Sequence, residues 1–321
     1  GLQLLDYILF ALLSLFVHVV VNQKNISYLV MLLIYIFIAF PSTFKVEHNM
    51  LIFGADPGWR YTDMRGFGST LEPWFWFKAY WIAWALLLSI SAKLLLARGR
   101  EQSLKHRFLM AKRNITSTTW GIVFMGIALL LTIGGFIFFN TNVLNAYQSN
   151  SDIIKKKSEY EKRYGRYRNM PQPHLISTKL HIQLYPNRQE VKIHAGYTLV
   201  NKDTVPIDTL HISSKLGILP IDVNFNRQAD AVQIDKELGH QIYALKQPLR
   251  PGDSLQLKIV IHHKQKGFKN SGNDNLVVKN GTYFTNYDLL PAIGYQRYKE
   301  INDAVIRKKL KLAARLAIPS L

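Results

Sequence analysis

The chain has 321 residues, with 40 Lys and Arg against 21 Asp and Glu, and a formal net charge of +19. Its length allows about two domains, and its lack of cysteine excludes disulfides, thiolate metal sites and cysteine nucleophiles. The positive charge does not predict nucleic-acid binding, because long apolar runs fill the chain up to Phe139 and no RNA- or DNA-binding motif accompanies them. Basic flanks beside membrane spans and anionic lipid explain it better.

Four apolar runs predict a transmembrane region over residues 1–145, with spans at about residues 2–21, 26–40, 74–97 and 118–139. Asp6 and His18 lie near the two ends of the first run, where contact with lipid headgroups is the expected role. A short hairpin joins the first two spans, and Pro41 ends the second. At 15 residues the second run is short, so it either borrows a turn from the hairpin or thins the bilayer locally.

The polar loop over residues 41–73 contains four glycines, but their spacing matches neither a P-loop nor a dinucleotide-binding motif. We expect a structured interfacial loop, with Trp59 and Tyr61 at headgroup level.

The third run opens with clustered aromatic residues, which predict a belt at the membrane interface. Lys78 and Lys93 lie near its two ends, where their side chains can extend to water. Glycines in the fourth run would permit close approach of a neighbouring helix. The aromatic residues are Trp74, Phe75, Trp76, Phe77, Tyr80, Trp81 and Trp84, and the glycines are Gly121, Gly126, Gly134 and Gly135.

The distribution of Lys and Arg predicts the orientation. The first hairpin contains one Lys or Arg, and the loop after the third run contains six. The loop after the second run contains three. The positive-inside rule then places the second loop and the C-terminal half outside, on a multi-pass protein of the inner or plasma membrane with a periplasmic β domain. Seven more Lys and Arg between Gln148 and Arg168 oppose this orientation, but basic segments that lead into long translocated domains weigh less.

The C-terminal half predicts a mainly antiparallel β-sandwich or saddle over residues 173–290, reached through a stalk or linker over residues 146–172. Residues 152–167 read as a solvated stalk helix that ends at Gly165. Apolar residues then alternate along about seven short segments, which is typical of strands with one buried face. The clearest are Leu180, Ile182 and Leu184; Ile193 to Leu199; Ile221 to Phe225; and Leu255 to Ile261. Residues 267–281 read as a polar loop, and residues 291–321 as a lead-in to a further domain, helix-compatible from Tyr298 to Ala317.

The sequence predicts no catalytic, cofactor-binding or metal-ligating residue. It contains no H-E-x-x-H and no G-x-S-x-G motif. His181, His194 and His211 each lie between apolar positions, so we expect them on a polar sheet face, where they face solvent or, if strand registers align, bind zinc. His262 and His263 are adjacent on one strand and point to opposite faces, which excludes a shared chelate.

Several segments of the β domain resemble the N-terminal saddle domain of aminopeptidase-N-type zinc metallopeptidases. They are LHIQLYP, VKIHAGYTLVNKDTVPIDTLHIS and PLRPGDSLQLKIVIHHKQKGF, with Gly196, Thr204, Leu210, His211, Leu249, Pro251 and Gly252 at the family's landmarks. NGTYFTN, followed by LLPAIGYQ, resembles the stretch that leads into the catalytic domain. The spans and the loop ADPGWRYTDMRGFGS are similar to a Bacteroidetes-type arrangement, in which an ABC-type permease membrane region is fused ahead of the peptidase.

The resemblance implies a fragment that ends before its catalytic domain. Zinc, its ligands and the catalytic glutamate would lie beyond Leu321, so the chain by itself is expected to be a non-catalytic membrane anchor and scaffold without a metal. Its expected partners are the lipid bilayer and that C-terminal domain, with peptides as substrates of the whole protein and no nucleic acid. The alternative from another class is an ABC-type permease, transporter or receptor subunit whose outer β domain binds a partner.

Overall fold

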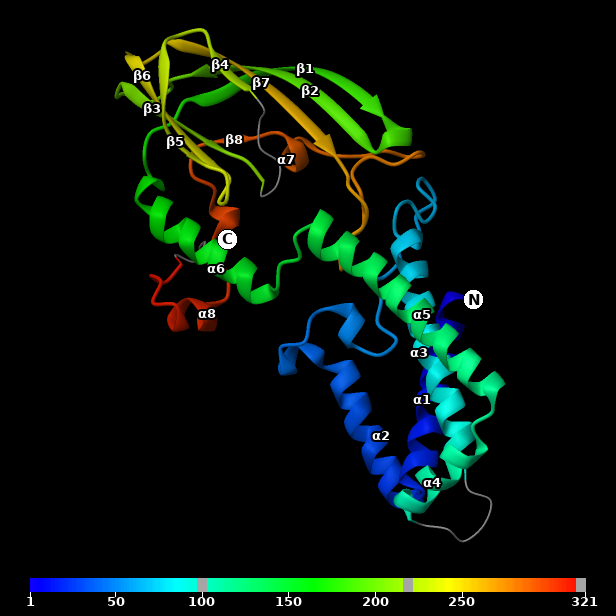
Figure 1. Ribbon diagram of the computed structural model, residues 1–321. Coiled ribbons are helices and arrows are strands. Elements are labelled where there is room, and N and C mark those ends of the chain that lie inside the picture. The colour runs from blue at the N-terminus through cyan, green and yellow to red at the C-terminus, as the bar shows by residue number, and fades with distance from the viewer. Residues whose placement is uncertain (97–102, 216–221, 316–321) are drawn as a thin grey trace. The chain divides into compact units, whose positions relative to one another are not determined.

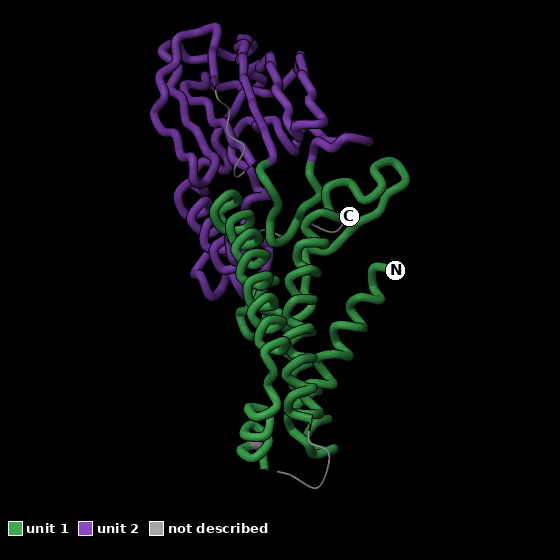
Figure 2. The backbone as a smooth tube through the Cα atoms, turned by 45° about the vertical axis from the view of Figure 1, so that its right-hand side comes forward, with its two compact units in different colours: residues 1–147, 266–275 green, residues 148–265, 276–321 purple. Residues whose placement is uncertain are grey.

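The computed structural model describes residues 1–96, 103–215 and 222–315 (Figure 1). The chain forms two compact units (Figure 2): a helical unit of residues 1–147 and 266–275, and a sheet unit of residues 148–265 and 276–321. Some predicted features lie outside the described residues: the end of the third span at Ala97, the basic loop at Arg98 and Arg100, the strand residue Ile221, and Ala317 at the end of the predicted C-terminal helix.

Three helices of the helical unit are long and apolar enough to cross a membrane: α1 (Leu2–Val21), α3 (Leu71–Leu95) and α5 (Ser117–Phe138), which continues as a π-helical turn to Leu144. The second predicted span forms a shorter apolar helix of 16 residues, α2 (Lys24–Ala39). Asn22, in a left-handed conformation, ends α1 and makes the tight hairpin. An amphipathic helix, α4 (Leu104–Asn114), precedes α5. Short 3-10 turns follow α2, at Pro41–Phe44 and Asn49–Leu51.

Helix α3 is the centre of the helical unit, because both α1 and α5 pack against it. Gly126 and Gly134 of α5 face Leu87 and Tyr80 of α3, and a Cβ at Gly126 would lie only 2.7 Å from the Leu87 side chain. These two glycines therefore let the helices approach closely, as expected from the sequence, whereas Gly121 and Gly135 have no neighbouring atom of the described chain within 4 Å of a Cβ position. The predicted aromatic belt is wrong in part, because four of its members (Trp74, Phe77, Tyr80 and Trp81) are buried within the unit, while Phe75 and Trp84 are exposed.

Residues 266–275 belong to the helical unit although they follow a strand of the sheet unit. Asn49 donates two hydrogen bonds to Asn270. Its backbone N–H donates to the side-chain Oδ1 at 2.9 Å, and its side-chain Nδ2 donates to the backbone carbonyl oxygen at 2.6 Å. Arg65 forms an ion pair with Asp274 at 2.8 Å, and Phe268 is buried beside Phe77. The predicted polar loop is thus an anchored segment, and the chain passes between the two units three times.

The sheet unit contains two four-stranded sheets in which every strand pair is antiparallel. The first has the order β1-β2-β7-β4 and the second β5-β6-β3-β8. The strands of the first are β1 (His174–Tyr185), β2 (Glu190–Val200), β7 (Ser254–Lys264) and β4 (Asp222–Phe225). Those of the second are β5 (Ala229–Asp235), β6 (His240–Leu249), β3 (Ile207–Ser213) and β8 (Ala292–Ile293).

Both sheets contribute to one hydrophobic core. Burial alternates along β2 and β7, which contribute residues such as Ile193 and Leu257, and β3 and β6 contribute Leu210, Ile212 and Leu249. Period-two alternation therefore predicts β2 and β7 correctly, because a pleated strand points successive side chains to opposite faces.

Helix α6 (Asn150–Tyr164) packs against the second sheet. It begins with a capping box of Ser149 and Asp152 and ends at Gly165, as expected from the sequence. The expectation that this helix is solvated is wrong for one side, where Tyr160 and Tyr164 are buried against residues that include Leu238.

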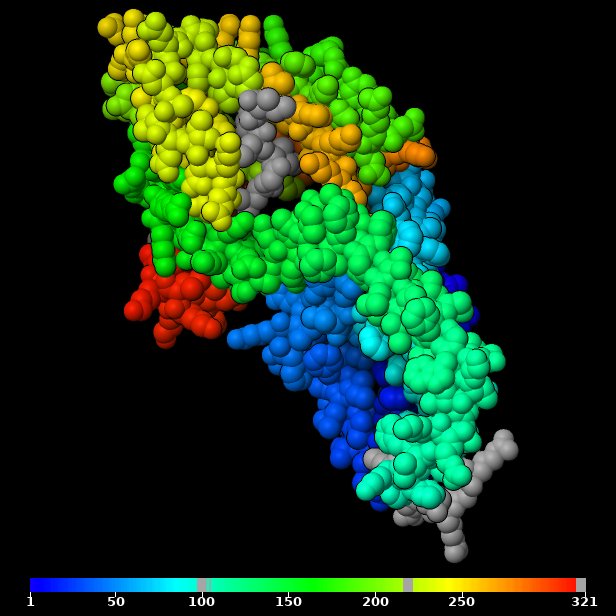
Figure 3. Space-filling model, viewed as in Figure 1, coloured from blue at the N-terminus to red at the C-terminus, as the bar shows by residue number. Residues whose placement is uncertain are grey.

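The C-terminal residues return to α6 within the same unit (Figure 3). Of the helix expected from Tyr298 to Ala317, only α8 (Ala304–Lys309) forms in the described part. Lys311 adopts a left-handed φ of 56° just beyond it, and the chain folds back so that Arg307 binds the carbonyl oxygen of Ala313. Arg307 also bonds Glu161 of α6, with Nη1 to Oε2 at 2.9 Å. A short helix, α7 (Asn286–Leu289), precedes β8, and 3-10 turns occur at Gly165–Tyr167, Pro186–Arg188 and Arg297–Lys299.

Candidate functional site

The strongest candidate for a functional surface is an apolar face of the first sheet that is only partly covered. Leu180, Ile182 and Leu184 of β1 lie opposite the buried residues Ala195, Ile193 and Val191 of β2. Directly opposed residues of an antiparallel pair share a face, so β1 extends the face that forms the core. Yet these three side chains are 39%, 43% and 39% exposed.

The prediction that β1 buries one face is therefore wrong. The reason is its position, because β1 is the outermost strand of its sheet and has a strand neighbour on one side only. The exposed row continues toward the start of the strand with Leu175 and Ile176. Thr178 lies between Leu175 and Leu180 in this row, and exposed apolar residues grouped in this way are typical of an interaction surface. We call the side chains of Leu175, Leu180, Ile182 and Leu184 the open face.

A groove of about 460 Å³ lies at the beginning of β1. Gln172 shapes one side: its Nε2 donates to the carbonyl oxygen of Thr209 at 2.9 Å, and its Oε1 accepts from the backbone N of His211 at 2.8 Å. The hydroxyl of Tyr197 donates to the carbonyl oxygen of Pro291 at 3.1 Å, and burial raises the pKa of this phenol, which keeps it neutral. The groove residues are Gln172–Leu175, Thr178, Tyr197, Asn286, Tyr287 and Leu290–Ile293.

The groove could receive a short segment with both apolar and polar groups. Half of its twelve lining residues are apolar, and two of the polar ones, Gln172 and Tyr197, are held in fixed positions by hydrogen bonds. Tyr287, on its rim, is 86% exposed, so a partner could contact this ring directly. The segment 286–293 comes from the stretch NYDLLPAI, whose role the sequence could not specify beyond the family resemblance.

The histidines do not meet on one face. His181 and His194 lie opposite each other on β1 and β2, are exposed, and have ring centroids 6.2 Å apart. His211 is buried in the second sheet, because Leu210–Ser213 of β3 are buried in succession without alternation. The expectation that His211 lies on the same polar face as His181 and His194 is therefore wrong. Within residues 1–96, 103–215 and 222–315, no three His, Asp or Glu side chains are close enough to hold a metal ion.

His211 instead forms a buried pair with His240. Its Nδ1 lies 3.1 Å from Nε2 of His240, and the ring of Tyr164 lies 4.2 Å from that of His240, measured between centroids. Burial lowers the pKa of His211 to about 4 and, with repulsion from His211 and Lys299, lowers that of His240 to about 3. Both imidazoles are therefore neutral at pH 7.

Lys299 closes the other side of this polar centre. Its ammonium group donates to the carbonyl oxygens of Ser214, Leu238 and Gly239 at 2.7, 3.1 and 3.1 Å. It also lies 4.9 Å from the ring centroid of Tyr160, and burial lowers its pKa to about 8. Because three carbonyl oxygens accept its protons, this lysine joins β3, β6 and the turn before β6 and serves the structure of the unit.

A comparable lysine lies in the helical unit. Lys78 was expected to extend to water, but its side chain is only 2% exposed, which overturns that expectation. Its Nζ lies 2.6 Å from Oδ2 of Asp56, donates to the carbonyl oxygen of Gly54 at 2.7 Å, and also binds Asp6. Trp81 donates to the carbonyl oxygen of Ala55 at 2.9 Å. The cluster thus ties the loop after α2 to α1 and α3, and Asp6, whose side chain is still 46% exposed, has a protein partner.

The ammonium groups of the two lysines are bonded within their own units. His211 Nε2 and His240 Nδ1 are buried without a hydrogen-bond partner among the described residues, whereas the open face and its groove remain accessible. Two neutral histidines and two lysines bound to oxygen atoms stabilise the fold and do not form a set of a nucleophile and a base. The open face can accept another folded surface. The site that the structure favours is therefore a docking surface.

No protein-family profile matches the chain, and no curated protein matches it significantly. Solved structures that match part of it include an M1 zinc metallopeptidase from Deinococcus radiodurans, with 18% identity and a TM-score of 0.25 over 30% of this chain and 21% of that one. A mutant M1 zinc metallopeptidase from the same organism, bound to a Tyr-Ser-Ala substrate, matches with the same identity and coverage and a TM-score of 0.24. Another mutant from that organism has 17% identity and a TM-score of 0.24 over 32% of this chain and 25% of that one. The chain thus spans about a fifth to a quarter of the length of these metallopeptidases, to which it is weakly similar.

Proposed function

We propose that this chain is the membrane anchor and N-terminal saddle domain of an M1-type zinc metallopeptidase, with a scaffolding and not a catalytic role. In this proposal the helical unit holds the protein in the inner or plasma membrane through four spans, with Lys24–Ala39 as the fourth. The sheet unit is a β-sandwich or saddle on the extracytoplasmic side. It receives a catalytic domain that carries the zinc and acts on peptides.

The open face is the observation that carries the proposal. Leu180, Ile182 and Leu184 continue a core-forming face and yet are about two-fifths exposed. Burying a whole Leu or Ile side chain contributes about 1.5–3 kcal/mol, so covering the exposed part of each would contribute roughly 1 kcal/mol. A domain docked there would gain this energy along the full row.

The places of the family landmarks in the fold also support the proposal. Pro186 follows β1 directly, and Gly196 lies within β2. His211 lies in β3. The turn at Pro251 and Gly252 precedes β7, with Gly252 at a φ of +82° that favours glycine. These positions in strands and turns are compatible with the resemblance and support the proposal.

The decisive experiment uses the natural full-length protein. Its reading frame should continue into a domain with H-E-x-x-H and a later glutamate, and membranes that contain it should cleave aminoacyl-p-nitroanilides in a chelator-sensitive way. The 321-residue chain alone should be inactive and bind no stoichiometric zinc. One tightly held zinc per chain, or a full-length protein with further spans in place of a peptidase domain, would refute the proposal and favour a transporter or receptor subunit.

Two adjacent positions on β1 provide a matched pair of variants for the open face. Ile182 belongs to the open face, whereas His181 points to the opposite face and is also exposed. In the full-length protein, Ile182→Glu should weaken the association of the two domains, measured by limited proteolysis between them, and lower peptidase activity. His181→Glu should leave both unchanged.

The absence of cysteine makes the predicted orientation directly testable. A single cysteine at Asn187, an exposed position after β1, should react with a membrane-impermeant maleimide in intact cells. A cysteine at Arg113, exposed at the end of α4, should react only after the membrane is permeabilised. The reverse pattern would place the sheet unit on the cytoplasmic side.

A further inference from the structure

We propose that the groove between α4 and the C-terminal end of α3 binds one anionic phospholipid, an inference that rests on the proposed membrane anchor. The groove has a volume of about 590 Å³, within the range of small-molecule sites. Its walls are almost entirely apolar, and the polar exceptions are two lysines and a serine. The lining residues are Ser91, Leu94, Leu95, Lys105, Phe108, Leu109, Ala111, Lys112 and Ile115.

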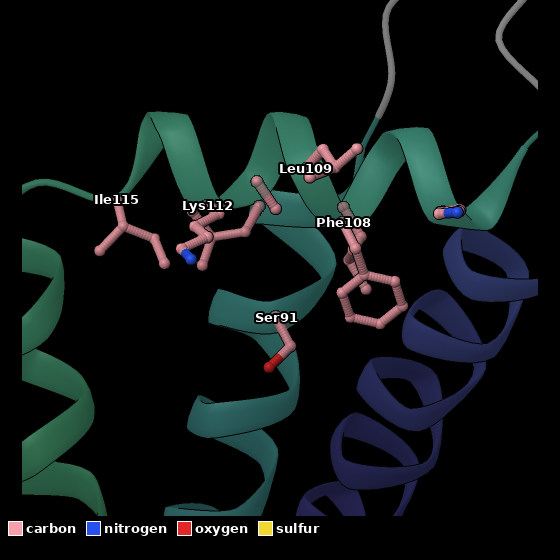
Figure 4. Close-up of a pocket in the computed structure, with 9 residues that line it drawn as sticks. Ser91, Phe108, Leu109, Lys112 and Ile115 are labelled. Atoms are coloured by element: carbon pink, nitrogen blue, oxygen red, sulfur yellow. The ribbon is translucent and has the colours of Figure 1, made fainter.

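One face of α4 supplies both the apolar wall and the charge. Lys105, Phe108, Leu109 and Lys112 are spaced at i, i+3, i+4 and i+7, so they share one side of the helix. Figure 4 shows α4 crossing the end of α3, with the Phe108 ring extending from α4 to the level of Ser91 on α3. The two lysines are exposed, and roughly 10 Å of helix separates them at 1.5 Å per residue.

Arg107 fixes α4 in this position. Its Nε donates to the carbonyl oxygen of Leu95 at 2.9 Å, and its Nη1 donates to that of Val20 at 3.3 Å. These carbonyls lie at the C-terminal ends of α3 and α1, where free acceptors and the helix dipole favour a cation. Since Arg107 is only 3% exposed and already bonded, it holds the groove in shape and leaves Lys105 and Lys112 to meet a ligand.

An anionic phospholipid satisfies both parts of the groove at once. Phe108 and Leu109 are 59% and 56% exposed, which favours an apolar occupant such as an acyl chain. None of the described lining residues is acidic, so the two lysines require a negative group such as a lipid phosphate. A basic amphipathic helix with these properties is typical of the membrane interface. A second copy of this chain fits less well, because a two-fold contact would bring the same lysines against one another.

The test is native mass spectrometry of the full chain released from detergent micelles that contain phosphatidylglycerol or phosphatidylcholine. Wild-type protein should retain one phosphatidylglycerol in preference to phosphatidylcholine. The double substitution Lys105→Gln with Lys112→Gln should lower apparent phosphatidylglycerol affinity by roughly 30-fold, which corresponds to about 2 kcal/mol at about 1 kcal/mol per basic group.

The control is Lys93→Gln with Arg113→Gln, which removes the same charge from exposed positions that do not line the groove. This control variant should keep the preference for phosphatidylglycerol over phosphatidylcholine. A second variant, Leu109→Trp, fills the groove without changing its charge and should also reduce binding. Tryptophan fluorescence of each variant confirms that the helical unit is folded.

Three outcomes would overturn the inference. Equal binding of the two lipids, equal losses in the groove variant and the control, or a dimer in place of a lipid adduct would each do so. Failure of the anchor proposal gives a different result, because the chain would then remain in the soluble fraction of cells and bind neither lipid.

Discussion

Acidification should unfold the sheet unit through the buried pair of His211 and His240. The two rings are 1% and 0% exposed, and their facing nitrogens lie 3.1 Å apart. A proton on either ring places a positive charge in an apolar setting, next to the second ring and near the ammonium of Lys299. The unfolded chain carries no such cost, so it binds protons more readily than the folded chain.

The pKa shifts set the size and direction of this effect. The ordinary pKa of 6.5 falls to about 4 for His211 and about 3 for His240 in the folded state. Both pKa values are lower in the folded state than in the unfolded chain. The folded state therefore keeps its full stability above about pH 6.5 and loses it as the pH falls below that value. Between pH 7 and pH 5, each histidine then lowers the free energy of unfolding by about 2 kcal/mol, and the pair lowers it by about 4 kcal/mol. This loss is a large fraction of the 5–15 kcal/mol typical of a folded domain.

The positions of the tryptophans allow the two units to be followed separately. All six tryptophans lie between Trp59 and Trp120, in the helical unit, so their fluorescence reports that unit alone. Hydrogen exchange of peptides from β3 and β6 reports the sheet unit. From pH 7 to pH 5, the free energy of opening of β3 and β6 should fall, while the tryptophan signal changes little.

Matched variants separate the contribution of the histidine pair to the pH dependence from that of carboxylates, whose pKa values are lower. His211→Gln with His240→Gln removes both buried titrations and should flatten the pH dependence of exchange in β3 and β6. His181→Gln with His194→Gln removes two exposed histidines and should leave the wild-type slope. Equal slopes in all three proteins would refute the reasoning.

Three further substitutions test the other polar centres. Arg307→Met removes the closer cation of buried Glu161 on α6 and leaves it only the 3.5 Å contact with Arg168, so it should lower the free energy of unfolding of the sheet unit by about 3 kcal/mol, measured by denaturant titration with hydrogen exchange. Gly239→Ala should cost about 1–2 kcal/mol for a φ of +64°, plus the clash of a Cβ only 2.6 Å from a backbone carbonyl oxygen. Gly252→Ala, at a φ of +82° with open space around the Cβ, should cost the conformational part alone, and equal losses would contradict the clash. Lys78→Met leaves two carboxylates without their cation and should lower the thermal midpoint of tryptophan fluorescence, whereas Lys93→Met, an exposed change on the same helix, should not.

Local patterns in the sequence predict most of the elements correctly. Runs of apolar residues give α1, α3 and α5 within a few residues of their bounds, and alternation gives β2 and β7. These features depend on the period of a single helix or strand, which the sequence displays directly. Asn22 ends α1 in a left-handed conformation, whereas Gly165 keeps a right-handed helical backbone and α6 passes there into a 3-10 turn.

Features that depend on the neighbour of an element could not be read from the same patterns. β1 and β2 alternate alike, but only β2 has a strand on each side, so the same pattern gives an exposed row in one and a buried row in the other. His211 has the spacing of a surface residue, and its burial depends on β3 joining the second sheet. Lys78 finds its carboxylates 22 and 72 residues away in the sequence, at Asp56 and Asp6. Such pairings follow from topology, which a single sequence does not specify.

The anchored segment 266–275 gives this dependence on topology a mechanical consequence. It lies between β7 and Leu276, so the strand that runs through the middle of the first sheet continues directly into residues bonded to the helical unit. Asn270 and Asp274 hold that segment at Asn49 and Arg65, on the loop between α2 and α3. The same loop is held to α1 and α3 by Lys78. The end of β7 therefore leads along the chain into a segment that hydrogen bonds and an ion pair hold to the loop between α2 and α3, so the order of the first sheet and that of the helical unit depend on the same ten residues.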